Sequence, residues 1–303
     1  MMTENQSFSK SQIVQLSRQY SFSPNKKLGQ NFLIDKNITD KIIEAVSPAP
    51  KDVFLEIGAG LGALTLPFAG LGAKLTAFEI DKKLYHVLSE KTANFKNVRL
   101  LHQDFLEFDF KGFSKTKRAR VVGNIPYYIT SVIIEKLAQH KECVEDIHLM
   151  VQKEFAARLT ATPAAGKDYS SITLFANYHF SIEKLFMVRK GCFWPAPDVD
   201  SVFLRMKKHK DALVKVKDEQ ILFSIIRGAF NQRRKTIFNS LSSCVDICED
   251  KEKLKLVFDK AGISPSLRAE NLRLEDFVKL ANIISQRNVK LNRWNKVKSL
   301  MKR

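Results

Sequence analysis

Short apolar runs alternate with longer helix-like stretches in the first half of the chain. The runs have the length of buried strands and lie at Val53–Ile57, Lys74–Glu79, Val98–His102, Ala119–Gly123 and Ile147–Gln152. Apolar residues three to four positions apart predict helices in the gaps, for example over Asp81–Glu90 and Ser131–His140. Strands that alternate with helices predict an α/β fold, a doubly wound parallel sheet covered on both faces.

The pattern changes towards the C-terminus. Ile182–Val188 and Val199–Met206 flank the loop Gly191–Pro197 and are expected to close the sheet as antiparallel strands. Beyond Lys210, four amphipathic helices follow without strands, at Asp218–Arg233, Thr236–Val245, Lys251–Ala261 and Leu274–Gln286. We therefore expect four regions: an N-terminal arm over 1–23 that frays, the sheet domain over 24–208, a small all-helical domain over 209–286, and a basic tail over 287–303.

Charge is concentrated in the C-terminal third of this strongly basic chain. Lysine and arginine number 50 against 32 acidic residues, a net charge of +18. Residues 205–303 carry 24 basic and 11 acidic side chains, whereas residues 1–204 carry 26 and 21. Such a surplus on one region favours a polyanionic partner, namely a nucleic acid. The tail over 287–303 has seven basic residues and no acid, so contact with a membrane surface stays open for it.

The bulk composition excludes several other classes. No apolar run approaches the roughly 18 residues that a membrane-spanning helix needs. The four cysteines, Cys143, Cys192, Cys244 and Cys248, show neither a disulfide pattern nor zinc-ligand spacing, so we expect no metal and a reducing, cytoplasmic location.

A glycine-rich loop follows the first predicted strand. Gly58 and Gly60 lie where the chain turns from strand to helix, and glycine lets a backbone turn tightly and approach a ligand closely. The spacing of Gly58, Gly60 and Ala63 also fits a dinucleotide-binding loop. The glycine loop alone therefore fits two kinds of cofactor, a nicotinamide dinucleotide and S-adenosylmethionine.

Two acidic residues at successive strand ends outline a nucleoside pocket. Glu79 closes the second strand about 20 residues after Gly58, where doubly wound folds place a carboxylate that accepts from both ribose hydroxyls. Asp104 follows the third strand and can accept from an adenine amine, with Phe105 beside the ring. Asp104 favours S-adenosylmethionine over a nicotinamide cofactor.

The fourth strand runs into the most specific feature of the chain, the segment Asn124–Tyr127. This segment has the groups that a methyl transfer to the amine of adenine would need. The amine nitrogen, N6, is a poor nucleophile because its lone pair is delocalised into the ring. Two acceptors, the Asn124 side-chain oxygen and the Ile125 carbonyl oxygen, could hold its two hydrogens and free the lone pair. Pro126 fixes φ and has no competing N–H. Tyr127 offers a ring for base stacking, worth about 1–3 kcal/mol.

Several stretches resemble a known family. Asn-Ile-Pro-Tyr resembles the RNA adenine N6-methyltransferases, and further stretches resemble their small-subunit ribosomal branch, the KsgA/Dim1 family, over about residues 24–286. The matching stretches are Lys26–Leu33, Met150–Glu154, Phe193–Ser201, Gln232–Thr236 and Arg268–Leu272.

The resemblance implies a Rossmann-like class I methyltransferase fold over 24–208 and a site. It places Asn31 and Leu33 at the methionine end of S-adenosylmethionine, with Gly58, Gly60, Glu79, Asp104 and Asn124 completing the cofactor pocket. Phe193 would be the second wall of the base sandwich opposite Tyr127, and a core aromatic is the alternative for it. The implied reaction is dimethylation of two adjacent adenines near the 3′ end of small-subunit ribosomal RNA.

An enzyme that modifies a base must take it out of its stack, so a surface for phosphates should lie beside the pocket. The candidates are basic residues, namely Lys26, Lys27, Arg233, Arg234 and Lys235, with Arg158 and Lys167 as weaker ones. The expected partners are small-subunit ribosomal RNA and the immature small subunit, and we expect a monomer that binds no membrane.

Three other functions stay open at this point. The antibiotic-resistance methyltransferases of large-subunit RNA share Asn-Ile-Pro-Tyr. A non-catalytic nucleic-acid-binding factor could use the same scaffold. An oxidoreductase would explain the glycine loop but not the segment Asn124–Tyr127.

Overall fold

The computed structural model describes residues 8–25, 28–244 and 250–286, and its chain divides into two compact units. The sheet unit holds the residues up to 156 together with 179–208, and the helical unit holds 157–178 and the residues from 209 onwards. Residues 157–178 therefore belong to the helical unit, whereas the sequence analysis assigned them to the sheet domain. The predicted basic tail over 287–303 lies outside the described residues.

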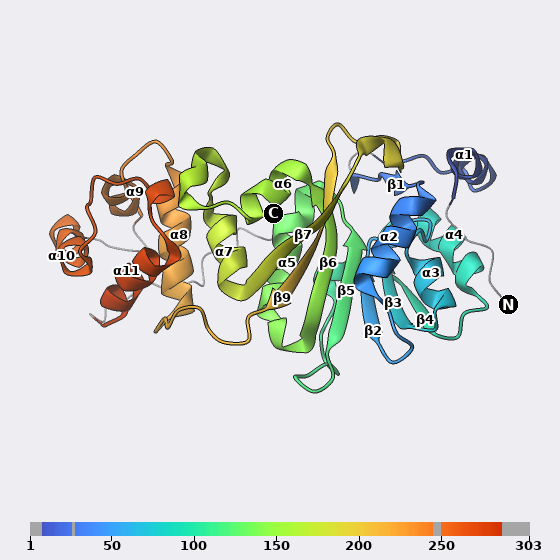
Figure 1. Ribbon diagram of the computed structural model, residues 1–303, viewed down its shortest axis with the longest axis horizontal. Helices are drawn as coiled ribbons and strands as arrows, with labels where there is room; N and C mark the ends of the chain where they lie inside the picture. The colour runs from blue at the N-terminus through green and yellow to red at the C-terminus, as the bar shows by residue number, and fades with distance from the viewer. Residues whose placement is uncertain (1–7, 26–27, 245–249, 287–303) are drawn as a thin grey trace. The chain divides into compact units, whose positions relative to one another are not determined.

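The sheet unit is built on a seven-stranded sheet (Figure 1). Five strands run parallel, and two antiparallel strands close one edge. The spatial order is β4 (Val98–His102), β3 (Lys74–Glu79), β2 (Val53–Ile57), β5 (Ala119–Asn124), β6 (Val144–Gln152), β9 (Ser201–Lys208) and β7 (Phe180–Val188). The predicted doubly wound α/β fold with an antiparallel finish is confirmed.

Helix α2 (Lys36–Val46) precedes β2, the first parallel strand. Helices α3 (Thr65–Gly70), α4 (Lys82–Thr92) and α5 (Thr130–Gln139) lie between parallel strands, and the short α6 (Lys153–Leu159) follows β6. Asp81, two residues after the end of β3, caps α4 by accepting from the backbone N–H groups of Lys83 and Leu84. The predicted bounds of α4 and α5 agree with the structure to within two residues, and α2 was not predicted.

The N-terminal residues are more ordered than expected. Lys10–Gln19 form helix α1, in place of the frayed arm that the sequence analysis expected. A capping box starts the helix: Ser9 Oγ accepts from the Gln12 N–H, and Gln12 Oε1 accepts from the Ser9 N–H at 2.8 Å. Ile13 is completely buried. The segment therefore docks on the sheet unit.

A two-stranded ribbon joins distant parts of the sheet unit. β1 (Phe32–Leu33) pairs antiparallel with β8 (Phe193–Trp194), so that Leu33 faces Phe193 in register. β8 lies within the predicted loop Gly191–Pro197. The ribbon therefore ties the chain ahead of α2 to the connection between β7 and β9.

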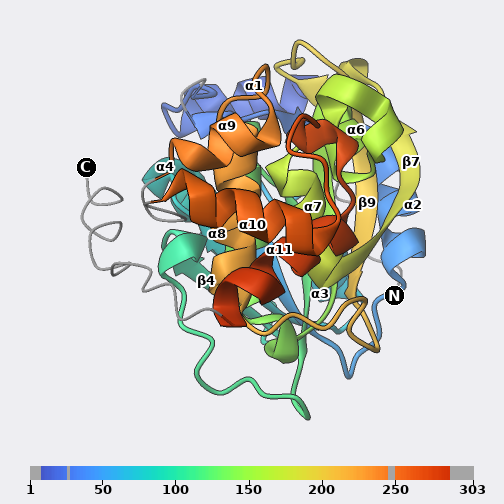
Figure 2. The ribbon, with the colours of Figure 1, turned by 90° about the vertical axis from the view of Figure 1, so that its left-hand side faces the viewer.

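The helical unit has its own hydrophobic core. Its helices are α7 (Ser171–His179), α8 (Glu219–Asn231), α9 (Ile237–Ser242), α10 (Lys251–Ala261) and α11 (Leu274–Gln286), and Figure 2 shows α8 to α11 packed side by side. Leu222, Phe258 and Phe277 are fully buried at its centre. Leu174 of α7 joins the same cluster, which explains why residues 157–178 group with this unit.

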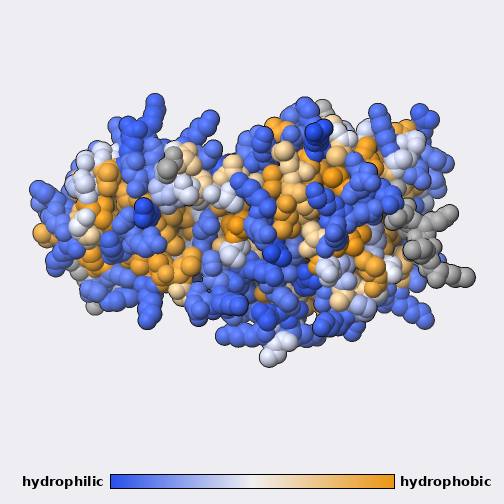
Figure 3. Space-filling view, in the orientation of Figure 1, coloured by the Kyte–Doolittle hydropathy of each residue, from blue (hydrophilic) through white to orange (hydrophobic). Residues whose placement is uncertain are grey.

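Among the described residues, no helix is long and apolar enough to cross a membrane. Hydrophilic residues cover much of the face drawn in Figure 3, with apolar patches between them.

Candidate active site

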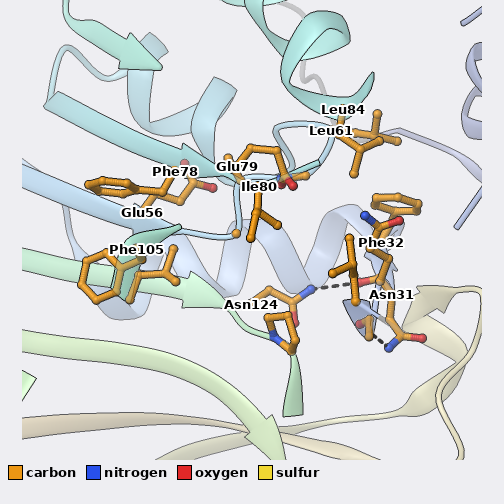
Figure 4. Close-up of a pocket in the computed structure, with 18 of the residues that line it drawn as sticks. Asn31, Phe32, Glu56, Leu61, Phe78, Glu79, Ile80, Leu84, Phe105 and Asn124 are labelled. Atoms are coloured by element: carbon orange, nitrogen blue, oxygen red, sulfur yellow. Dashed lines mark hydrogen bonds between the residues drawn. The ribbon is translucent and has the colours of Figure 1, made fainter. Parts of the chain in front are cut away.

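A pocket of about 260 Å³ opens at the carboxyl ends of the parallel strands of the sheet unit. All seven residues predicted to bind the cofactor line it: Asn31, Leu33, Gly58, Gly60, Glu79, Asp104 and Asn124. Most of them lie at or just beyond the ends of β2, β3, β4 and β5, because parallel strands bring their carboxyl ends to one edge of a sheet. Figure 4 shows Phe78 and Phe105 on one side of the pocket and Phe32, Leu61 and Leu84 on the opposite side.

Glu79 is held at the end of β3 by the glycine loop. The side chain is 5% exposed, and its Oε2 accepts from the Gly60 N–H at 2.7 Å while Oε1 accepts from the Asp81 N–H at 2.8 Å. Gly60 has a φ of 57°, which glycine adopts without strain. Burial raises the pKa of Glu79. Each carboxylate oxygen has a further lone pair, so the geometry permits acceptance from two hydroxyls of a ligand.

Asp104 and its neighbours form a slot for a flat ring. Asp104 Oδ1 accepts from the Leu106 N–H at 2.9 Å, which fixes the carboxylate beside the pocket. Phe105 is buried edge-on against Phe78, with ring centroids 5.3 Å apart. Ile80 lines the same pocket and keeps an exposed side chain. The sequence analysis did not name Ile80, because a lone apolar residue after a strand carries no signal of its own.

Glu56 is a third acid of the pocket, after Glu79 and Asp104, and the sequence pattern did not mark it as a site residue. It lies in β2, is 1% exposed, and its Oε2 accepts from Thr65 Oγ1 at 2.7 Å. Burial raises the pKa of this carboxyl to about 8. An acid within an apolar strand was the available signal. A buried carboxyl here can neutralise a positively charged ligand.

Asn124 presents its side-chain oxygen in a fixed direction. Its Nδ2 donates to the Asn31 carbonyl oxygen at 3.0 Å, shown as a dashed line in Figure 4. A carbonyl oxygen only accepts, so the amide nitrogen must face Asn31 and Oδ1 must point elsewhere. Asn31 is itself fixed, because its Nδ2 donates to the Gly29 carbonyl oxygen at 3.0 Å.

The segment around Asn31 packs directly on the loop that follows β5. Gly29 has a φ of 60°, and a Cβ built there would lie 3.2 Å from Pro126 Cβ. A side chain at this position would therefore push the two loops apart. Pro126 lines the pocket, whereas the Ile125 side chain is buried outside the set of lining residues. The group predicted to act at Ile125 is its backbone carbonyl.

The two tyrosines of this loop have different environments. The Tyr127 hydroxyl lies 2.9 Å from Ser201 Oγ in hydrogen-bond contact, and burial raises its pKa. Tyr127 is not among the residues that line the pocket, but Tyr128 is, with a side chain 61% exposed. The more exposed ring at the pocket therefore belongs to Tyr128, to which the sequence pattern assigned no role.

Phe193 lies in the hydrophobic core. It is 2% exposed, and it belongs to the apolar cluster that contains Leu33 and Phe203. It does not line the pocket. The core aromatic, held open as the alternative to a wall for the target base, describes its position in this structure.

The predicted RNA contacts divide into three groups. Lys26 and Lys27 lie outside the described residues. Arg234 and Lys235 are exposed in the turn before α9. Arg233 in the same turn donates to the carbonyl oxygens of Lys167 at 2.7 Å and Tyr169 at 3.1 Å, and it pairs with Glu270. The guanidinium of Arg233 is thus engaged inside the helical unit.

Comparisons with known proteins agree with this geometry. A family model described as ribosomal RNA adenine dimethylase matches residues 21–286. The chain is 40% identical over 271 residues to the ribosomal RNA small subunit methyltransferase A of Geobacillus thermodenitrificans, covering 88% of this chain and 92% of that protein. It is 36% identical to the protein of the same name from Clostridium botulinum, covering 89% and 97%.

Two solved structures resemble this chain over most of its length. A dimethyladenosine transferase from Plasmodium falciparum aligns with a TM-score of 0.69 at 25% identity, covering 85% of this chain and 98% of that chain. The 23S rRNA methyltransferase ErmE aligns with a TM-score of 0.61 at 26% identity, covering 84% and 100%. With a family model that spans the sheet and most of the helical unit, the chain belongs to the ribosomal RNA adenine dimethylase family.

Proposed function

We propose that this chain transfers methyl groups from S-adenosylmethionine to N6 of adenines in small-subunit ribosomal RNA. The observation that carries the proposal is Asn124, whose amide is oriented by the Asn31 carbonyl inside a pocket with two acids at strand ends. Curated relatives that are 36–40% identical bear the name of small-subunit methyltransferases. A nicotinamide-dependent oxidoreductase would have no use for an acceptor amide at this position.

The pocket residues suit S-adenosylmethionine. Glu79 would accept from the ribose hydroxyls, and Asp104 from the adenine amine, with Ile80 and Phe105 against the ring. Asn31 and Leu33 would hold the methionine end, and the buried Glu56 would supply negative charge by giving up its proton when a cationic ligand binds. When bound, S-adenosylmethionine supplies an electrophilic methyl group on a positively charged sulfur.

The chain's contribution to transfer is orientation. Asn124 Oδ1 and the Ile125 carbonyl oxygen would accept the two hydrogens of adenine N6, which makes the nitrogen lone pair available for in-line attack. Holding both reactants in place in the pocket would contribute to the rate, as would displacing water from it. No strong base is needed, because the N6 proton becomes very acidic once the methyl group is attached.

A base must be swung out of its stack to reach this pocket. We assign the stacking surface to the loop Pro126–Tyr128, in which Tyr128 is exposed at the pocket and Tyr127, whose hydroxyl contacts Ser201, is the ring predicted to stack on the base. Among the predicted RNA contacts, Arg234 and Lys235 are exposed, and we propose that they contact phosphates. We further propose that the substrate is the immature small subunit, that two adjacent adenines are each dimethylated, and that the chain acts as a monomer in the cytoplasm.

The test is a transfer assay with methyl-labelled S-adenosylmethionine and immature small and large subunits offered separately. We expect label in dimethyladenosine of the small-subunit RNA alone. Asn124→Ala should lower transfer at least about 100-fold while RNA binding stays intact. Asn124→Asp keeps an acceptor but loses the donor to Asn31, so it should also be impaired. A fully active Asn124→Ala enzyme, or label confined to large-subunit RNA, would overturn the proposal.

A further inference from the structure

Two of the side chains that line the pocket come from outside the region matched by the family model. Phe8 and Ile13 both contribute to the lining. They lie before and within α1, whereas the match begins at residue 21. The pocket is therefore completed by a segment that the family description does not include.

Polar contacts fix this segment to α4. The Tyr20 hydroxyl donates to Glu90 Oε2 at 2.6 Å, and Lys83 Nζ donates to the Ser21 carbonyl oxygen. Lys91 Nζ lies 4.7 Å from the centroid of the Phe8 ring, within the range of a cation–π contact. Contacts with three residues of α4 hold both ends of the N-terminal segment in place.

Apolar packing sets which side of the pocket the segment closes. Ile13 belongs to a buried cluster with Phe32, Leu61 and Leu84. These three side chains lie on the side of the pocket opposite Phe105 (Figure 4). Phe32 follows Asn31 directly, and Leu61 follows Gly60 in the glycine loop. α1 therefore packs against both segments that would hold the ribose and the methionine end.

We propose that α1 and Phe8, which precedes it, form a wall of the S-adenosylmethionine pocket, in which Phe8 and Ile13 make apolar contact with the ribose and methionine side of the ligand. The identity of the ligand rests on the proposed function; the position of the wall rests on the contacts of α1. Burial of the aliphatic part of the ligand against these side chains strengthens binding. The capping box at Ser9 starts the helix at the position that brings Ile13 to the pocket.

The first experiment compares S-adenosylhomocysteine binding by calorimetry in matched variants of the full chain. Phe8→Ala should weaken binding about fivefold to tenfold, because it removes an apolar contact. Gln15→Ala, at an exposed position of the same helix, should bind like the parent chain. The melting temperature of ligand-free Phe8→Ala should stay within about 2 °C of the parent, so that lost affinity is not lost folding.

The second experiment uses trypsin, because Lys10 and Arg18 are exposed cleavage sites on α1. Saturating S-adenosylhomocysteine should slow cleavage after both residues in the parent chain and in Gln15→Ala, and less so in Phe8→Ala. The proposal that this segment forms a wall of the pocket would be wrong if Phe8→Ala bound S-adenosylhomocysteine as tightly as the parent chain, or if the ligand left the cleavage rates unchanged. A parent chain that does not bind S-adenosylhomocysteine would instead overturn the cofactor assignment, and the wall with it.

Discussion

At the residue scale, the site combines side chains that the sequence announces with others that only the fold brings in. Gly58, Glu79, Asp104 and Asn124 were predictable because strand ends and a specific tetrapeptide mark them. The role of Phe193 as a wall for the target base stays a prediction: the structure buries its side chain in β8, which pairs with β1, and leaves it out of the pocket lining. Phe8 and Tyr128 were missed, since a single aromatic residue that reaches a pocket wall through tertiary contacts leaves no local pattern.

Glu56 should make cofactor binding sensitive to pH. Its pKa is raised to about 8 by burial, so the carboxyl is largely protonated in the folded chain at pH 7. A group with a raised pKa contributes stability that is complete below its unfolded pKa of 4.5 and is lost as the pH rises through 8. A positively charged ligand favours the carboxylate form, so binding near pH 7 should release a proton.

Calorimetry in two buffers with different ionisation enthalpies measures that release. We expect close to one proton for the parent chain, and tighter binding of S-adenosylmethionine as the pH rises from 7 to 8. Glu56→Gln should bind more weakly and release none. Equal proton release in the parent and in Glu56→Gln would assign the effect to another group.

His148 in β6 should destabilise the sheet unit in acid. It is buried, and neither ring nitrogen has a hydrogen-bond partner among the described residues. Burial lowers its pKa from 6.5 to about 4. A histidine that is kept neutral by the fold contributes stability above its unfolded pKa, and this contribution is lost as the pH falls from 6.5 towards 4.

The parent chain should therefore lose about 2 kcal/mol of unfolding free energy through His148 between pH 7 and pH 5. Urea denaturation of the parent and of His148→Leu at both pH values measures the difference. His148→Leu should lose correspondingly less, because it has no proton to take up on unfolding. Parallel losses in the two chains would contradict this account.

At the scale of elements, the sequence predicts regular structure well and short structure poorly. β2, β3, β4, α10 and α11 have the bounds that periodicity predicts. The missed elements depend on tertiary contacts: α1 is mostly polar and is fixed by Ile13 and by its contacts with α4. The ribbon β1–β8 has two residues in each strand, too few for any pattern.

The turn between α8 and α9 holds two neighbouring arginines, Arg233 and Arg234, in different environments. Arg233 donates to backbone carbonyls at 166, 167 and 169, so it joins α8 to the segment before α7. Arg233→Ala should lower the unfolding free energy by about 1–3 kcal/mol, since it leaves acceptors unpaired. Arg234→Ala should leave stability unchanged and weaken RNA binding, with a salt slope smaller by about one.

Urea unfolding and RNA filter binding at several salt concentrations distinguish the two variants. The assignment of Arg234 to phosphate would fail if its replacement by alanine left the salt slope unaltered. Reduced stability in Arg234→Ala, with none in Arg233→Ala, would reverse the structural assignment.

At the scale of the whole molecule, the surplus of positive charge and the residues that line the pocket lie in different regions of the sequence. Residues 205–303 carry a net charge of +13, whereas every residue that lines the pocket lies before residue 134. Affinity for small-subunit RNA should therefore fall steeply between about 50 and 200 mM salt, while affinity for S-adenosylhomocysteine should barely change. Titrations of both ligands over this range test the separation, and equal salt dependence would refute it.

The strand order has a consequence for synthesis. β7 precedes β9 in the chain but pairs only with β9, which itself pairs with β6. Until residues 201–208 have emerged from the exit tunnel, a nascent chain has a free β6 edge and an unpaired β7. Open strand edges favour association with other chains. Translation that stalls between residues 152 and 201 should thus yield aggregation-prone fragments, although every residue of the pocket has already been made.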